Sequence, residues 1–447
     1  MQSRESTWTP QADQPDYPDH LPADEGGPDA ARARLASQLE RHGPPLSASV
    51  RAAFARVPRH VFVPEIGPAA AYRDEAFVIK FGPDGLPVSS SSQPAMMAIM
   101  LDQLGLESGH RVLEIGTGTG YNAAVMSAVV GPGGEVVTID IDPELVARAR
   151  SSLLAAGYDT VTVKCADGGY GDPAGAPFDR IIVTAGAWDI APAWLGQLGP
   201  GGRLVLPLSI RGMQLSVGFE RQGDAWLSTS AARCGFVRML GAFAGPEEVI
   251  RLGEPTGITF QISDGYPVNA RALRAVLAAG EAVDEPVLVN LVTMADVADL
   301  DLWLTMTASE LDRLTVLATA SGGWLRQAPV PPFGALVANA TDAAQLGVAM
   351  LMPADPARPE PGEDWPGAVI RGLGPGGPDL AASLVELSAR WAELGRPGSH
   401  GLTMLVRSGV AQDGSLGGEL PGEPPEGWLV IERPSVTITA GWPVSLP

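Results

Sequence analysis

The sequence has few cysteines and no long apolar run. Among 447 residues only Cys165 and Cys234 are cysteine, which excludes a disulfide framework as the basis of the fold. No Cys/His spacing indicates a zinc site. No apolar run reaches the roughly 20 residues of a bilayer-spanning helix, and the N-terminus lacks the basic and apolar parts of a signal segment. We therefore expect a soluble, cytoplasmic protein with no membrane partner and no metal.

Basic residues are also scarce: 30 Lys and Arg stand against 51 Asp and Glu, for a formal net charge of -21. Residues 1–30 carry a net charge of -6, residues 31–246 carry -1 and residues 247–447 carry -14. No segment has the excess of base that a nucleic-acid face needs, so we expect no nucleic-acid partner. The acidic C-terminal third fits a basic peptide partner, or simply a solvated surface that aids solubility.

The most informative stretch is residues 111–122, which read as a strand, a glycine turn and the start of a helix. Gly116, Gly118 and Gly120 let the backbone turn tightly against a ligand. A dinucleotide-binding turn, G-x-G-x-x-G, would place its third glycine one residue later, and here Glu114 precedes the first glycine by two residues. The pattern predicts a cofactor other than NAD.

The order E-x-G-x-G-x-G resembles motif I of the class I S-adenosylmethionine methyltransferases, in which the strand-end acid faces the positively charged methionine part of the cofactor. A second strand is expected at residues 135–141 and contains Asp140, where such folds bind both ribose hydroxyls. The alternative role for Asp140 is the cap of the helix that begins near Pro143. Asp142 fits that cap better.

Three motifs upstream of residue 111 extend the resemblance to one family. The protein-L-isoaspartate O-methyltransferase family carries V-P-R-H-x-F-V-P, A-Y-x-D and T-I-S-x-P in this order before motif I. The matching stretches are residues 57–64, Ala71-Tyr72-Arg73-Asp74 and Ser90-Ser91-Ser92-Gln93-Pro94. Further matches follow at Ala166-Asp167-Gly168, at 178–185, at 200–207 and at Gln214, so the resemblance covers about residues 33–243.

The resemblance implies an α/β fold, a class I methyltransferase Rossmann-like sheet with helices on both faces. It implies S-adenosylmethionine as cofactor and S-adenosylhomocysteine as product. The cofactor-binding residues it implies are Ser90, Gln93, Glu114, Gly116, Gly118, Gly120, Asp140, Asp167, Gly168 and Gln214. We interpret His60 as a packed, hydrogen-bonded structural residue and Cys165 as part of the core.

Carboxyl methylation needs little general acid–base catalysis, because a carboxylate with a pKa near 4 is already an ionised nucleophile at neutral pH. The site must hold oxygen, methyl and sulfur in line and exclude water. A hydroxyl can orient one carboxylate oxygen without neutralising the other. Ser92, which aligns with the serine of T-I-S, is the predicted catalytic residue. Ser91 replaces the family's aliphatic residue and 81–87 lacks the glycine-rich approach to this motif, which indicates altered substrate selection.

The composition divides the chain into three parts. Residues 1–30 hold five prolines and almost no aliphatic pattern, so we expect a disordered acidic arm. Residues 31–246 form the methyltransferase domain. Residues 247–447 form a second, α+β domain for substrate recognition or an accessory role. In it we expect strands at 257–262, 286–292, 334–338, 348–352, 402–407 and 428–432, helices at 269–279, 308–319 and 378–394, and exposed loops at 353–367 and 410–426.

An extension of this kind resembles the enlarged branch of the family found with ribosomal-peptide pathways such as those for lanthipeptides and graspetides. The resemblance implies methylation of a chosen Asp in a constrained precursor peptide, of which a macrocyclised peptide is one form. The following amide nitrogen can then displace methanol and close a succinimide (aspartimide). Two alternatives stay open. One is repair of isoaspartyl (D-aspartyl) residues in damaged proteins, and the other is a scaffold that binds S-adenosylmethionine without catalysing methyl transfer.

Overall fold

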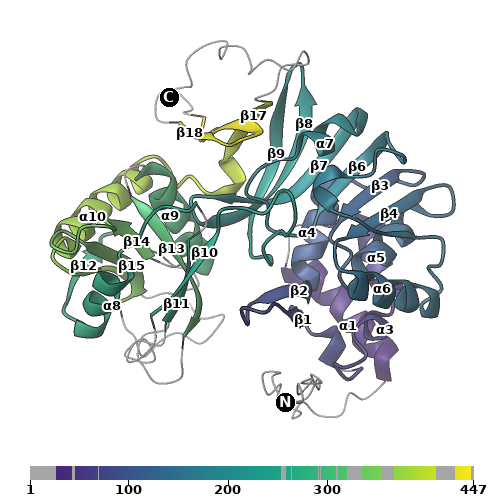
Figure 1. Ribbon diagram of the computed structural model, residues 1–447, viewed down its shortest axis with the longest axis horizontal. Coiled ribbons are helices and arrows are strands. Elements are labelled where there is room, and N and C mark those ends of the chain that lie inside the picture. Colours follow the sequence, from purple (N-terminus) through teal and green to yellow (C-terminus); the bar gives the residue numbers. More distant parts are fainter. Residues whose placement is uncertain are drawn as a thin grey trace, which may run out of the picture.

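The computed structural model describes residues 27–42, 46–68, 70–252, 258–262, 264–289, 291, 293–308, 311–319, 335–354, 367–408 and 428–443. Most of the expected acidic arm and of the two expected loops lies outside these residues. The helix α1 begins at Gly27, so the last four residues assigned to the arm are helical. Figure 1 shows two units side by side, one around a large sheet and one around a smaller sheet. No described helix is long and apolar enough to cross a membrane.

The large sheet has ten strands in the order β18-β19-β17-β9-β8-β7-β6-β3-β4-β5. Its parallel part consists of β3 (Arg111–Ile115), β4 (Glu135–Asp140), β5 (Thr162–Cys165), β6 (Phe178–Val183) and β7 (Leu198–Ile210). The antiparallel part adds β8 (Met213–Gln222) and β9 (Ala225–Cys234). The carboxyl ends of β3, β4 and β6 therefore meet at one edge, where the glycine turn after β3 lies.

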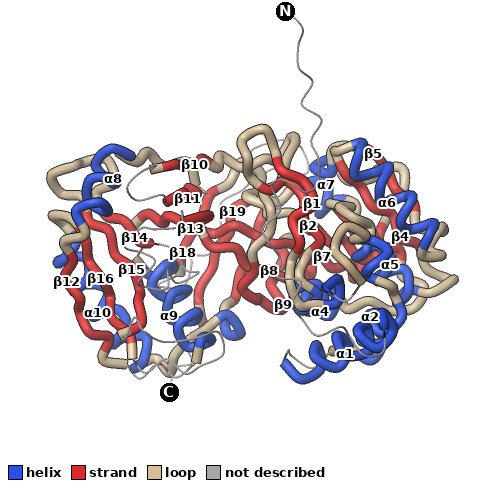
Figure 2. Tube along the Cα trace, turned by 90° about the horizontal axis from the view of Figure 1, so that it is seen from below, coloured by secondary structure: helices blue, strands red, loops and turns tan. Residues whose placement is uncertain are grey.

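Helices cover both faces of this sheet (Figures 1 and 2). On one face, apolar residues of α1 (Gly27–His42), α2 (Ala48–Arg56), α4 (Pro94–Leu104), α5 (Tyr121–Val130) and α6 (Pro143–Ala155) pack on alternate strand residues such as Val112 and Val136. On the other face, Leu113 and Val137 pack with Trp194 of α7 (Pro192–Gly196). The expected Rossmann-like layering is confirmed.

The smaller sheet is antiparallel, in the order β10-β11-β13-β14-β15-β16-β12. Its strands are β10 (Glu248–Arg251), β11 (Ile258–Ile262), β12 (Ala282–Val287), β13 (Asp312–Thr319), β14 (Ala335–Ala338), β15 (Gly347–Pro353) and β16 (Ala368–Leu373). Ala349 and Leu351 face α9 (Met294–Thr307) and α10 (Gly377–Glu393), while Val348 and Met350 face α8 (Ala270–Ala279). The region beyond residue 246 thus contains a sheet with helices on both faces.

Two predictions in this region were wrong. Residues 312–319, expected as helix, form β13, which is held between β11 and β14. The helix lies earlier, as α9, and begins with a capping box between Thr293 and Asp296. The strand expected at 286–292 ends at Val287, although Val289 and Leu291 are buried. In both cases an apolar run did not distinguish buried strand, helix and irregular chain, and pairing with a neighbouring strand decided the conformation.

The chain returns to the large sheet at its end. The strands β17 (Thr403–Ser408), β18 (Leu429–Glu432) and β19 (Val436–Gly441) extend it beyond β9, where Val406 pairs with Trp226. Figure 1 shows them beside β9 and away from the smaller sheet. The predicted division at residues 246 and 247 remains a prediction, and the last three strands belong to the sheet of the first unit.

The segments upstream of β3 are held together by one buried cation. The guanidinium of Arg59, in α3 (Arg59–Phe62), is fully buried and donates to the backbone carbonyls of Ala71, Arg73, Glu75 and Ser92 at 2.8–3.1 Å. It also lies 4.9 Å from the ring centroid of Phe77. Burial lowers the pKa of Arg59 to about 10, so it stays charged at neutral pH.

We predict that Arg59→Met lowers the free energy of unfolding by about 3 kcal/mol, because several buried carbonyl groups lose their donor together. The measurement is the urea midpoint followed by circular dichroism. The control is Arg56→Met, which removes an exposed arginine from α2 and should change stability by less than about 0.5 kcal/mol. Equal midpoints for the two variants would contradict the role of Arg59.

Candidate active site

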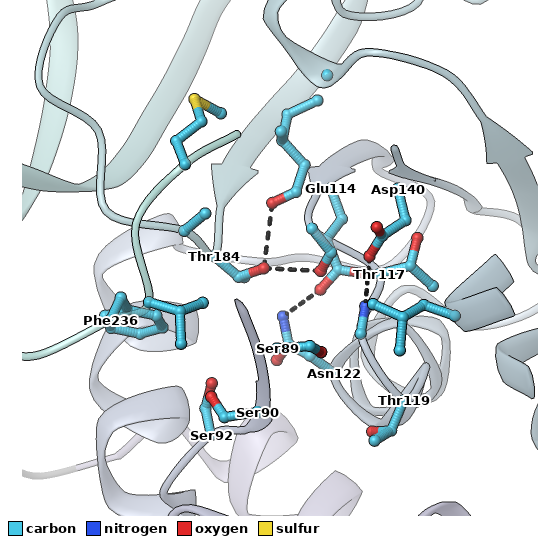
Figure 3. A pocket seen from close by; sticks show the side chains of 18 of the residues that line it. Ser89, Ser90, Ser92, Glu114, Thr117, Thr119, Asn122, Asp140, Thr184 and Phe236 are labelled. Carbon is cyan, nitrogen blue, oxygen red and sulfur yellow. Dashed lines mark hydrogen bonds between the residues drawn. The ribbon is translucent and has the colours of Figure 1, made fainter. Parts of the chain in front are cut away.

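A pocket lies at the carboxyl edge of β3, β4 and β6. Its walls come from the turn after β3, the ends of β4 and β6, and the hairpin of β1 (Phe77–Phe81) and β2 (Pro87–Ser91), together with residues 236–240. Figure 3 shows Ser90 and Ser92 close together, and Asp140 apart from them across the pocket. Segments far apart in the sequence therefore form one cavity.

Seven of the predicted site residues line this pocket: Ser90, Ser92, Glu114, Gly116, Gly118, Asp140 and Gly168. The turn needs glycine at two of these positions. Gly116 has φ +101° and its added Cβ would lie 2.5 Å from Thr184 Oγ1, while Gly118 has φ +51°. The backbone N–H of Gly118 donates to Asp140 Oδ2 at 3.0 Å, which joins the turn to the end of β4.

Glu114 is fully buried at the inner wall. Its carboxylate accepts a hydrogen bond from Asn122 Nδ2 at 2.8 Å (Figure 3) and another from Thr138 Oγ1 at 2.6 Å. Burial raises the pKa of Glu114 to about 7, although these hydrogen bonds oppose the shift. A cation that entered the pocket beside Glu114 would favour the ionised form.

Asp140 is half-buried at the end of β4. Its carboxylate accepts from the backbone N–H groups of Gly118 and Asp142, each at 3.0 Å. Burial raises its pKa and the backbone hydrogen bonds oppose this. The cap of α6 is Asp142, which accepts from Glu144 N and Leu145 N. The preference for Asp142 as the cap is confirmed, and Asp140 keeps its place on the pocket wall.

Four predicted cofactor-binding residues do not line the pocket: Gln93, Gly120, Asp167 and Gln214. Gln93 is exposed at the start of α4 and donates to Asp74 Oδ2 at 3.0 Å. A Cβ at Gly120 would meet Ala149 and Leu153 of α6 at 3.3 Å. In the structure, Gln93 thus contacts Asp74 and Gly120 lies against α6.

Asp167 and Gln214 hold the ends of the segment formed by residues 236–242. Gln214 accepts from the backbone N–H of Phe236 at 2.6 Å and donates to its carbonyl at 3.3 Å. Asp167 accepts from Ala242 N at 2.7 Å and from Gly169 N at 2.9 Å. Of the motif at 166–168, Gly168 thus lines the pocket. Asp167 instead binds the backbone at the end of the segment 236–242.

The upstream motifs converge on Ser92. Ser92 follows β2 and is half-buried, and its carbonyl accepts from Arg59 at 3.0 Å. Asp74 accepts from Ala95 N at 2.8 Å, in the first turn of α4, which begins two residues after Ser92. His60 Nδ1 lies 2.8 Å from Tyr72 Oη, which confirms its structural interpretation. Motif residues outside the pocket fix the position of the serine inside it.

Three residues at the site were not predicted from the sequence, and one residue predicted in the core is exposed. Asn122 and Thr138 bind Glu114, and Thr184 Oγ1 donates to the carbonyl of Gly116 at 2.7 Å. Asn122 lies in the stretch 111–122 already singled out, and a polar residue at the start of the helix after the glycine turn could have indicated it. Cys165, expected in the core, is exposed at the end of β5. Among the described residues, no group of His, Cys, Asp and Glu could hold a metal ion.

The β1–β2 hairpin is tied down on both sides of the pocket. Lys80 Nζ lies 2.6 Å from Asp142 Oδ2 and 2.6 Å from Glu144 Oε2, at the start of α6. At the hairpin tip, Asp84 pairs with Arg238, and its carbonyl accepts from Arg251 of β10 at 2.5 Å. The hairpin therefore covers the pocket and contacts the smaller sheet.

Comparison with known proteins agrees with the predicted resemblance. The family model described as protein-L-isoaspartate(D-aspartate) O-methyltransferase (PCMT) matches residues 30–242. The protein-L-isoaspartate O-methyltransferase of Methanopyrus kandleri is 42% identical over 221 residues, which are 48% of this chain and 95% of that protein. The protein of the same name from Hyperthermus butylicus is 41% identical over 226 residues, 48% of this chain and 91% of that protein.

Two solved structures also resemble this chain. A protein-L-isoaspartate O-methyltransferase superimposes with a TM-score of 0.44 at 23% identity, covering 84% of this chain and 96% of that chain. A putative enzyme of this name from Plasmodium falciparum, in complex with S-adenosyl-L-homocysteine, has a TM-score of 0.40 at 18% identity, covering 48% of this chain and 98% of its own. On the sequence matches, the chain belongs to the protein-L-isoaspartate(D-aspartate) O-methyltransferase family, enzymes that transfer a methyl group from S-adenosylmethionine to protein carboxylates.

Proposed function

We propose that this enzyme methylates the side chain of an Asp in a ribosomally made, constrained precursor peptide in the cytoplasm, and that the ester then closes to a succinimide. The observation that carries the proposal is the contact between the smaller sheet and the pocket cover, through Arg251 and the hairpin tip at Asp84. The family match ends at residue 242, so the contact comes from a region that the family model does not include. A unit that touches the pocket cover can select substrates.

The pocket residues fit S-adenosylmethionine. The glycine turn leaves no room for a side chain at Gly116, and the buried carboxylate of Glu114 suits a cationic methionine part. Asp140 lies at the end of the adjacent strand and suits the ribose hydroxyls. When bound, S-adenosylmethionine supplies a methyl group on a positively charged sulfur. An ionised carboxylate oxygen can displace that sulfur without proton transfer.

The protein's part in this reaction is positioning. The Ser92 hydroxyl donates to one oxygen of the acceptor carboxylate and leaves the other free to attack the methyl carbon. Arg59 and Asp74 hold the backbone on both sides of Ser92. The hairpin, fixed by Lys80 and by Asp84, limits the water that competes for the carboxylate.

After methylation, the ester carbonyl is the electrophile. The amide nitrogen of the following substrate residue attacks this carbonyl, loses its proton and displaces methanol, which closes the five-membered ring. Repair of isoaspartyl proteins uses the same ring as an intermediate, whereas peptide maturation keeps it. The second candidate function is this repair, which the names of the relatives favour.

We predict that binding of S-adenosylmethionine weakens as the pH falls below 7, by at most about tenfold per pH unit. The reason is that Glu114, with its pKa raised to about 7, must lose its proton to face the cationic ligand. Calorimetry between pH 6 and 8, in two buffers with different ionisation enthalpies, measures the affinity and the proton release. In Glu114→Gln the proton release should disappear. The same release in that variant would assign it to another group.

We predict that Ser92→Ala slows methyl transfer by roughly ten- to a thousandfold while cofactor affinity stays nearly unchanged. The matched control is Ser151→Ala, which removes an exposed hydroxyl from α6 and should leave the rate close to that of the natural enzyme. Single-turnover transfer of labelled methyl groups measures the rate. A wild-type rate in Ser92→Ala would exclude the proposed role.

We predict that the full-length enzyme methylates an ordinary Asp in a macrocyclic peptide and leaves linear isoaspartyl peptides largely untouched. The full chain is needed, because a truncation at residue 246 would remove β17 and expose the edge of β9. Mass spectrometry should show the gain of one methylene, followed by a net loss of one water if the succinimide persists. Efficient turnover of unrelated isoaspartyl peptides would establish repair instead.

A further inference from the structure

Arg238 carries the one basic side chain among the described residues that line the pocket. The acids that line it are Glu114, Asp140 and Asp142. Lys80, nearby on the hairpin, is paired with Asp142 and Glu144. An anionic substrate that approaches this pocket therefore meets three carboxylates and one guanidinium.

The backbone on both sides of Arg238 is held firmly. The carbonyl of Val237 accepts from Gly186 N at 2.8 Å, and Met239 N donates to the carbonyl of Gly186 at 3.1 Å. Gln214 and Asp167 fix the two ends of the same segment, at Phe236 and Ala242. This fixed backbone directs the Arg238 side chain to the hairpin that covers the pocket.

The partner of Arg238 is an acid that a substrate can replace. Asp84 lies on the hairpin turn, and the Asp84 and Arg238 side chains are 34% and 29% exposed. Replacing Asp84 by a substrate carboxylate costs little free energy, because water already screens this partly exposed ion pair. Glu247 also faces the guanidinium, and burial raises the pKa of Glu247 to about 7, so it competes weakly for the charge.

We propose that Arg238 determines substrate specificity by binding an acidic side chain next to the acceptor residue, in place of Asp84. The proposal rests on the proposed peptide substrate and specifies its chemistry: a peptide with a second carboxylate close to the methylated one. The acceptor carboxylate itself is a poor partner for Arg238, because a charge-paired oxygen is a weaker nucleophile.

The net charge of the chain opposes acidic substrates, and a cation at the pocket offsets that charge locally. With a net charge of -21, the protein repels acidic peptides at long range. At physiological salt this repulsion is screened beyond about 8 Å, so a fixed cation at the pocket decides whether a nearby carboxylate is accepted. A bidentate guanidinium suits that task.

The experiment compares pairs of synthetic ten-residue peptides, in macrocyclic and linear forms, that differ only in Glu or Gln on both sides of a central Asp or isoaspartyl acceptor. Binding to the full-length protein is measured calorimetrically with S-adenosylhomocysteine present, so the result does not depend on turnover. The natural protein should bind the Glu peptide about tenfold more tightly than the Gln peptide. Arg238→Gln should remove this difference, and Arg221→Gln, which removes an exposed charge on β8, should keep it.

Asp84→Asn separates substrate binding from a structural role of the ion pair. If Asp84 occupies the place of the substrate carboxylate, its removal should tighten binding of the Glu peptide. If the pair only holds the hairpin, Asp84→Asn and Arg238→Gln should weaken both peptides alike, which would overturn the proposal. Equal affinity of the natural protein for the two peptides would also overturn it. Failure of the proposed function would instead appear as methylation of isoaspartyl rather than Asp acceptors.

Discussion

The active site depends on the buried guanidinium of Arg59. It binds the carbonyls of three consecutive stretches, around Ala71, Glu75 and Ser92, and stacks near Phe77 of the hairpin. A buried charge is costly unless hydrogen bonds replace its hydration, and here the two terminal nitrogens of Arg59 donate to four backbone carbonyls. Because one planar group satisfies them together, the start of the hairpin and the serine after it have a fixed relative position.

The glycine turn and the serine loop come from different parts of the chain and play different parts in the site. The turn after β3 depends on backbone geometry, since Gly116 allows no side chain against Thr184. The serine loop depends on polar contacts from outside the pocket, such as those of Asp74. The pocket thus combines a rigid strand edge on one side with a tethered hairpin on the other.

The region beyond the family match contacts the rest of the protein at several places. The strand β10 leads from the pocket segment into the smaller sheet and contacts the hairpin through Arg251. The chain then returns to pair β17 with β9. Leu302 and Met306 of α9 also belong to the core beneath the large sheet. Core residues of α9 and the returning strand β17 thus connect the region beyond the family match to the large sheet.

The sequence by itself determined the cofactor side of this protein. Glu114, the glycine turn and Asp140 lie within thirty residues of one another, and local strand and turn geometry brings them to one edge of a parallel sheet. The upstream motifs likewise predicted Ser92, and the structure places it on the pocket wall. Only the tertiary structure decided the contacts of Asp167 and Gln214 with residues 236–242 and the exposure of Cys165. It also decided the strand at 312–319 and the pairing of β17 with β9. These features depend on contacts between segments far apart in the chain, and hydrophobic periodicity carries no information about such partners.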